Sequence, residues 1–210
     1  VKSEELKEHL IPFIEKEENT VATTALRAVG KIGDSSKIEY LLEKLEDSDF
    51  PEKNKPTIIL VFGDLKSKEA VPVLIEIIED PYEEKIWRMY ACDSLGKIGD
   101  ERAIPVLKKV FSENDALLRA YAAHALSFFD LPSIINLLIQ GLKDSNWKVR
   151  FHCTEALAQE GADDAVGILK YKAKKDPVKK VRTGAIKALG EIGTKECFDF
   201  IRELFTKKQE

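Results

Sequence analysis

One structural unit recurs along this sequence with a period of about 32 residues, and this repeat constrains the fold more than any other feature. An apolar residue marks the same register in each copy, and successive members are 33, 33, 31, 31 and 32 residues apart. This first column comprises Val29, Phe62, Leu95, Leu126, Leu157 and Leu189. A second apolar column lies 12 residues further along, at Leu41, Leu74, Leu107, Leu138, Leu169 and Ile201. A third column is acidic, at Asp47, Asp80, Glu113 and Asp144, with Asp176 one position later in its repeat. Three columns in register indicate tandem copies of one unit.

Each unit is predicted to hold two helices. In the fifth repeat, one helical face carries apolar residues at the spacings i, i+4, i+7 and i+8: Val149, Cys153, Ala156 and Leu157. A turn then follows, because glycine adopts the left-handed conformation that ends a helix and aspartate caps the next one. The predicted turns are Gly33-Asp34, Gly63-Asp64, Gly99-Asp100 and Gly161-Ala162-Asp163. Pro72 and Pro105 fit the first turn of the second helix, where a missing N–H does no harm.

A helix pair of this length cannot bury its apolar stripe alone, so stacked neighbours must bury a continuous core. We therefore expect an all-α fold, a right-handed α-solenoid of about six helix pairs behind an N-terminal capping helix. The whole chain, 1–210, is predicted to be one domain. The predicted segments are a capping helix at 1–18 and repeats at about 19–47, 48–80, 81–113, 114–144, 145–176 and 177–210.

The repeat pattern V-R-x-x-A-x-x-A-L-G-x-I-G-D-x-x-A-I-P-x-L resembles HEAT repeats, in particular the short subclass named after phycobilin lyases. It is carried by Val181-Arg182 with Ala185, Ala188-Leu189-Gly190 and Ile192-Gly193, and by Leu95–Asp100 with Ala103–Leu107. Repeat two departs from the pattern through Pro56 and through Lys55 in place of arginine. Repeat four lacks the glycines, since it has Leu126-Ser127-Phe128-Phe129-Asp130.

The resemblance implies a ladder of acidic and arginine residues that links successive repeats and has a structural role. In this chain the implied pairs are Glu113/Arg119, Asp144/Arg150 and Asp176/Arg182, with Arg88 as a further member. If these pairs are partly buried, removal of one partner would leave an uncompensated charge.

The residues offer little for catalysis. His152 has Glu155 three residues later, but a metal site would need more ligands than this pair. Hydroxylases that hold a di-iron centre on a HEAT-like fold carry repeated His-Glu dipeptides, and this chain has none. Cys92, Cys153 and Cys197 show no CxxC spacing and fit small core positions. We therefore expect no catalytic residue, no metal, no cofactor and no enzymatic activity.

Composition favours a cytoplasmic protein. The apolar stretches are far shorter than the ~20 residues of a membrane helix. The first ten residues are polar and acidic, unlike a signal peptide. No Gly-rich phosphate loop is present.

Charge is distributed unevenly. Residues 1–105 carry 15 basic and 23 acidic side chains, whereas residues 106–210 carry 18 and 14. The segment Lys170–Arg182 is strongly basic, and Trp147 near an inter-repeat turn is a candidate aromatic anchor. The predicted binding residues are Lys108, Trp147, Lys170, Lys172, Lys174, Lys175, Lys179 and Lys180 with Glu39, Glu43 and Glu76.

These features predict a non-enzymatic scaffold that binds another protein on a concave face formed by the second helices. One alternative is an accessory protein similar to the phycobilin lyases. Another is binding of phosphate or nucleic acid through the basic C-terminal repeats, which the sequence pI of about 5.6 disfavours. The identity of the protein partner, the oligomeric state and membership of a longer repeat array stay open.

Overall fold

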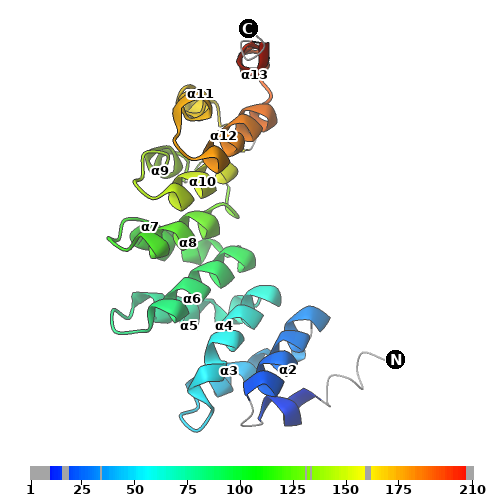
Figure 1. Ribbon diagram of the computed structural model, residues 1–210. Coiled ribbons are helices and arrows are strands. Elements are labelled where there is room, and N and C mark those ends of the chain that lie inside the picture. Colours follow the sequence, from blue (N-terminus) through cyan, green and yellow to red (C-terminus); the bar gives the residue numbers. More distant parts are fainter. Residues whose placement is uncertain are drawn as a thin grey trace. The chain divides into compact units, whose positions relative to one another are not determined.

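A computed structural model describes residues 10–15, 19–33, 35–130, 132, 134–158 and 162–206. Within these ranges the regular elements are all helices, joined by turns and short 3-10 segments (Figure 1). The prediction of an all-α fold is therefore confirmed. No helix in the described ranges has the length and apolar character needed to cross a membrane.

Each predicted repeat contains two helices. The first helices of the pairs are α2 (Asn19–Ile32), α4 (Lys55–Asp64), α6 (Lys85–Ile98), α8 (Ala116–Leu126), α10 (Trp147–Ala156) and α12 (Lys179–Ile192). The second helices are α3 (Ile38–Glu46), α5 (Val71–Glu79), α7 (Ile104–Phe111), α9 (Ile135–Gly141), α11 (Val166–Lys175) and α13 (Lys195–Thr206). In the predicted capping helix, residues 10–14 are helical, whereas 1–9 and 16–18 lie outside the described residues.

The chain divides into two compact units, Val1–Val106 and Leu107–Glu210. In the first unit, α4 packs against α2, and α6 packs against α4 and α5. In the second unit, α10 contacts both α8 and α12, while α12 also contacts α11 and α13 (Figure 1). Within each unit, the first helices therefore neighbour one another in chain order. The prediction of one domain over 1–210 stays a prediction.

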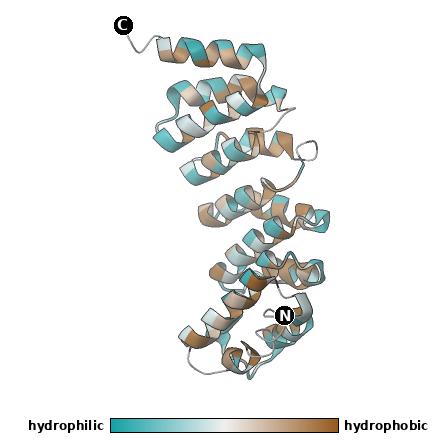
Figure 2. Ribbon diagram, turned by 90° about the vertical axis from the view of Figure 1, so that its right-hand side faces the viewer, coloured by the Kyte–Doolittle hydropathy of each residue, from teal (hydrophilic) through white to brown (hydrophobic). Residues whose placement is uncertain are grey.

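The two apolar columns form the core of the repeats. All six members of the first column are at most 2% exposed. In the second column, Leu41, Leu74, Leu107, Leu138 and Leu169 are fully buried, whereas Ile201 on the last helix is half-buried. Figure 2 shows that the helices carry hydrophobic and hydrophilic positions together, as amphipathic helices do. Burial of one such side chain contributes about 1.5–3 kcal/mol.

Glycine ends three of the first helices. Gly33, Gly99 and Gly193 have φ angles of +74°, +70° and +73°, the left-handed conformation that their sequence positions predict. After Gly99, the Asp100 side chain accepts a hydrogen bond from the Arg102 N–H and caps the next helical turn. Gly161 lies outside the described residues.

The predicted turn at Gly63-Asp64 is wrong. Helix α4 runs through both residues, and Lys66, with φ +52°, takes the left-handed position instead. Gly63 has a different role, because a Cβ atom there would lie 2.8 Å from the Cα of Ser94. The glycine thus permits the close approach of α4 and α6, and the chain turns three residues later.

Candidate functional site

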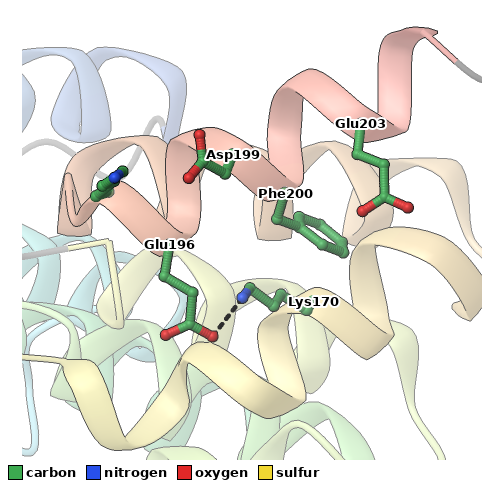
Figure 3. Close-up of a pocket in the computed structure, with 6 residues that line it drawn as sticks. Lys170, Glu196, Asp199, Phe200 and Glu203 are labelled. Carbon is green, nitrogen blue, oxygen red and sulfur yellow. Dashed lines mark hydrogen bonds and ion pairs between the residues drawn. The ribbon is translucent and has the colours of Figure 1, made fainter.

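The strongest candidate site lies along α13 in the second unit. Asp199 and Phe200 lie three and four residues after Glu196, and Glu203 lies four and three residues after them, so the four share one side of the helix. Their side chains line a shallow pocket of about 580 Å³, together with Lys170 of α11 and Lys195 (Figure 3). We call these six residues the carboxylate pocket.

An ammonium group already occupies one part of the carboxylate pocket. The Lys170 Nζ pairs with the Glu196 carboxylate and lies 5.5 Å from the centroid of the Phe200 ring (Figure 3). The Lys174 Nζ lies 4.7 Å from the same centroid. A cation over an aromatic face is attracted by the negative charge of that face. The pocket therefore has the chemistry that recognises an alkylammonium group.

A second cavity, of about 630 Å³, lies between α11, α12 and α13. We call it the basic groove. Its cationic residues are Lys174, Lys175, Lys179 and Arg182. Its other residues are Ala173, Thr183, Ile186, Leu204 and Phe205. The Phe205 side chain is 54% exposed, so the groove combines a basic rim with accessible apolar surface.

The structure distributes the predicted basic residues over several environments. Lys170 and Lys174 approach Phe200, and the Lys172 Nζ pairs with Asp176 at 3.3 Å. The Lys180 Nζ lies 5.7 Å from the ring centroid of Trp147, which is half-buried. Lys175 and Lys179 face the basic groove. The segment Lys170–Arg182 is therefore not one uniform positive patch.

The predicted binding residues of the earlier repeats lie on second helices. Glu39 and Glu43 are exposed on α3, and Glu76 is exposed on α5, all in the first unit. Lys108 is half-buried on α7. None of these four lines a cavity that the described residues form around α13.

The arginine ladder is present, but its side chains pair one repeat further along than the resemblance implied. Arg119 forms an ion pair with Asp144 at 2.8 Å, and Arg150 forms one with Asp176 at 2.8 Å. Each arginine does contact the acidic residue that was expected to be its partner, but through that residue's backbone. The arginine Nη1 donates a hydrogen bond to the carbonyl oxygen of the residue six positions earlier. These donations are from Arg119 to Glu113, from Arg150 to Asp144 and from Arg182 to Asp176.

Arg119 and Arg150 thereby each tie their own turn to the turn of the next repeat. In the first unit, the Arg88 Nε likewise donates to the Ile78 carbonyl oxygen. Burial would raise the pKa of Asp176, but Arg150, the Val178 N–H and Lys172 together outweigh burial and hold that pKa below its ordinary value. Arg119 lowers the pKa of Asp144 in the same way, again against the effect of burial. These contacts link neighbouring turns, and the structural role that the resemblance implied stays a prediction.

His124 and His152, the histidines within the described residues, form an aromatic contact. The rings of His124 on α8 and His152 on α10 are 4.9 Å apart, and the His152 Nδ1 lies 3.0 Å from a Glu155 oxygen. Burial and the neighbouring His124 lower the pKa of His152. Within the described ranges, no group of three or more His, Cys, Asp and Glu side chains is placed to hold a metal ion. A di-iron donor set therefore does not fit this part of the chain.

The three cysteines are buried and form no disulfide bond. Burial raises the pKa of Cys153, so its thiol is a core side chain and not an activated nucleophile.

The sequence reasoning missed the carboxylate pocket. The spacing of Glu196, Asp199 and Glu203 is visible in the sequence, but the stronger basic run before it obscures this pattern. The apolar surface at Phe205 was missed for the same reason.

Comparison with known proteins identifies relatives of two kinds. The sequence profile of a family described as spirochaete HEAT repeat protein matches residues 1–210. A deoxyhypusine hydroxylase of Drosophila pseudoobscura pseudoobscura is 29% identical over 126 residues, which are 59% of this chain and 40% of that protein. A deoxyhypusine hydroxylase of Schizosaccharomyces pombe is 40% identical over 58 residues, 28% of this chain and 18% of that protein. The chain thus spans less than half the length of these curated relatives.

Solved structures support the fold. The complex of CpcE and CpcF of phycocyanin lyase from Nostoc has a TM-score of 0.63 at 21% identity, covering 88% of this chain and 76% of that chain. A designed armadillo repeat protein in complex with the peptide (KR)4 has a TM-score of 0.61 at 14% identity, covering 88% and 98%. At these identities the likeness shows the fold alone. The predicted α-solenoid class and the resemblance to HEAT repeats are confirmed.

The predicted function is wrong. We expected a non-enzymatic scaffold that binds its partner on a concave face, but the curated relatives that match part of the chain are named deoxyhypusine hydroxylases, which are enzymes. The error arose because the absence of His-Glu dipeptides was taken to exclude the whole hydroxylase class, although sequence similarity outside the metal ligands can persist.

Proposed function

The chain belongs to the family of spirochaete HEAT repeat proteins, and from that premise we propose that it binds the substrate side chain in an enzymatic hydroxylation of the deoxyhypusine type. Sequence identity of 29–40% to five curated deoxyhypusine hydroxylases supports the reaction class. The observation that carries the proposal for this chain is the carboxylate pocket, whose groups suit an amine-bearing side chain.

Deoxyhypusine is an amine-bearing derivative of lysine, so its recognition requires negative charge close to an ammonium group. Three carboxylates and two ammonium groups line the carboxylate pocket, and the Lys174 ammonium also lies over its Phe200 ring. The contact of Lys170 with Glu196 and Phe200 is an internal example of the expected binding mode. A substrate ammonium would make the same kind of contact with a carboxylate further along α13.

Glu203 is the best placed group for this contact. Figure 3 shows Glu203 and Glu196 on either side of the Phe200 ring, with the Lys170 ammonium on the Glu196 side. A substrate amine would therefore bind on the Glu203 side of the ring. Asp199, one helical turn before Glu203, lies on the same rim and pairs with Arg202 at 3.5 Å.

The oxygen-transfer step is not assigned to any residue of this chain. The described residues provide no donor set for a di-iron centre. The proposal therefore gives these residues the roles of binding and orienting the substrate side chain, which place a reactive carbon but do not transfer oxygen themselves.

The proposal is tested by titrating the protein with two peptides of the same sequence, one bearing deoxyhypusine and one bearing N-acetyl-lysine. Hydrogen bonds to charged groups contribute about 1.5–3 kcal/mol, so we expect the cationic peptide to bind about tenfold more tightly or better. Equal affinities for the two peptides would contradict the proposal.

The variant Glu203→Gln keeps the shape of the side chain but removes its charge. We expect this variant to lose most of the preference for the cationic peptide. Glu191→Gln is the matched control, because Glu191 is exposed on α12 and lines neither the carboxylate pocket nor the basic groove.

A further inference from the structure

We infer that the basic groove binds an acidic peptide segment that carries one aromatic or aliphatic side chain. This inference goes beyond the proposed function and does not require it, because the basic groove and the carboxylate pocket have no lining residue in common. It rests on the charge of the rim, on the local helix geometry and on the apolar surface.

The rim of the basic groove has no acidic counterpart. Lys174, Lys175, Lys179 and Arg182 line the cavity, and no carboxylate among the described residues does. The nearby Asp176 is buried and already accepts hydrogen bonds from Arg150 and Lys172. Neither Lys175 nor Lys179 forms an ion pair with another described residue. The groove therefore presents positive charge that the described part of the chain does not neutralise.

Local helix geometry adds to this positive charge. Helix α12 begins at Lys179, its N-cap residue Val178 provides no side-chain hydrogen bond, and no acidic residue lies in its first turn. The positive end of the helix dipole lies next to the rim, and the buried Asp176 carboxylate accepts a hydrogen bond from the Val178 N–H there. The Arg182 Nη1 donates to the carbonyl oxygens of Asp176 and Pro177, which fixes the guanidinium at the groove.

The apolar surface of the groove favours a peptide over other anions. Ile186 and Leu204 are half-buried, and Phe205 is exposed. Inorganic phosphate would contact only the cations and would leave this surface uncovered. A nucleic-acid backbone would present charge without an aliphatic anchor. An acidic peptide with one apolar side chain would pair with the cations of the rim and cover the apolar surface of the groove. Aromatic side chains contribute much of the binding energy in such interfaces.

The test uses a fluorescein-labelled peptide in which acidic residues flank one phenylalanine, with binding followed by anisotropy. The comparison probes are the same peptide with serine in place of phenylalanine, and a single-stranded oligonucleotide. None of these probes carries deoxyhypusine or another alkylamine, so the result is independent of the carboxylate pocket. We expect the phenylalanine peptide to bind most tightly, and added salt to weaken its binding.

Two variants separate charge from apolar contact. Lys175→Glu combined with Lys179→Glu is expected to weaken binding of the phenylalanine peptide by tenfold or more. Phe205→Ser is expected to remove the advantage of the phenylalanine peptide over the serine peptide. Lys187→Glu is the matched control, since Lys187 is exposed on α12 outside the groove. All the substituted positions are exposed, and a thermal melt of each variant verifies that the fold is kept.

Three results would overturn the inference. The first is unchanged binding to the Lys175→Glu, Lys179→Glu variant. The second is oligonucleotide binding as tight as peptide binding with no effect of Phe205→Ser, which would identify a general polyanion site. The third is concentration-dependent self-association that the charge reversal abolishes, which would identify a second copy of the chain as the occupant.

Discussion

Arg150 and Asp176 form a two-point ion pair inside the second unit. The Arg150 Nε and Nη2 donate to the two carboxylate oxygens at 2.8 and 2.9 Å. The side chain of Arg150 is 8% exposed, and that of Asp176 is fully buried. The same arginine donates to the backbone carbonyl oxygen of Asp144, so one buried side chain connects two successive inter-repeat turns.

Truncation of this arginine should strongly destabilise the second unit. Arg150→Ala would leave the buried Asp176 carboxylate without its main partner, a change that typically costs about 3–5 kcal/mol. Chemical denaturation of the variant and the parent protein measures this loss. Arg202→Ala is the control, because the Arg202–Asp199 pair is exposed and its loss should change the stability little. Similar stability of the two variants would contradict the structural role of the ladder.

Acid should destabilise the fold through the same pairs. The folded-state pKa values of Asp144 and Asp176 lie below the ordinary value of 3.8. Their contribution to stability is therefore complete above about pH 4 and is lost as the pH falls through the folded-state values. The free energy of unfolding, measured from pH 6 down to acid, should drop below about pH 4. In Asp144→Asn combined with Asp176→Asn this drop should be smaller, and an unchanged acid slope would contradict the assignment.

Two glycines of the second unit should respond in opposite directions to alanine. A Cβ at Gly141 would contact Cys153 and would lie 2.6 Å from the Cζ of Phe111, and both of these side chains are buried. Gly141→Ala should therefore lower stability by about 1–3 kcal/mol. A Cβ at Gly190 in α12 would meet open space, with no packed neighbour within 4 Å, so Gly190→Ala should raise stability by about 0.5–1 kcal/mol. Thermal melts compare the two, and a loss in both would contradict this difference in packing.

The histidine pair gives a prediction that proton titration can check. The pKa of His152 is lowered by burial and by His124, whereas the Glu155 carboxylate raises it. In NMR titrations, His124→Ala should therefore raise the pKa of His152, and Glu155→Gln should lower it further. The surrounding Lys148 also lowers this pKa, so it must stay unchanged in both variants. A shift of the same sign in both variants would contradict the assigned contacts.

The helices could be predicted well from the sequence, because the buried side of a helix requires apolar residues at regular spacings along the chain. The columns that begin at Val29 and Leu41 are apolar in every repeat, and nearly every member is buried. The turn near Gly63 was predicted wrongly. A glycine that permits close helix packing cannot be distinguished in the sequence from a glycine that ends a helix. Only the approach of Ser94 distinguishes the two roles.

The ion-pair partners of the ladder arginines could not be predicted from the sequence, because they too depend on contacts between different helices. Arg150 is six residues from Asp144 and 26 from Asp176. Spacing alone favours the nearer residue, but its backbone, and not its carboxylate, accepts the hydrogen bond. The carboxylate pocket also depends on a contact between different helices, since Lys170 of α11 meets Glu196 and Phe200 of α13.

Chemical-shift mapping tests the central claim, substrate binding at the carboxylate pocket, most directly. Backbone amide resonances of the isotope-labelled protein are followed while the deoxyhypusine-bearing peptide is added. The account predicts saturable shifts centred on Lys195–Glu203 and Lys170, which Glu203→Gln strongly reduces. Saturable shifts that avoid these residues, or no shifts at all, would contradict it.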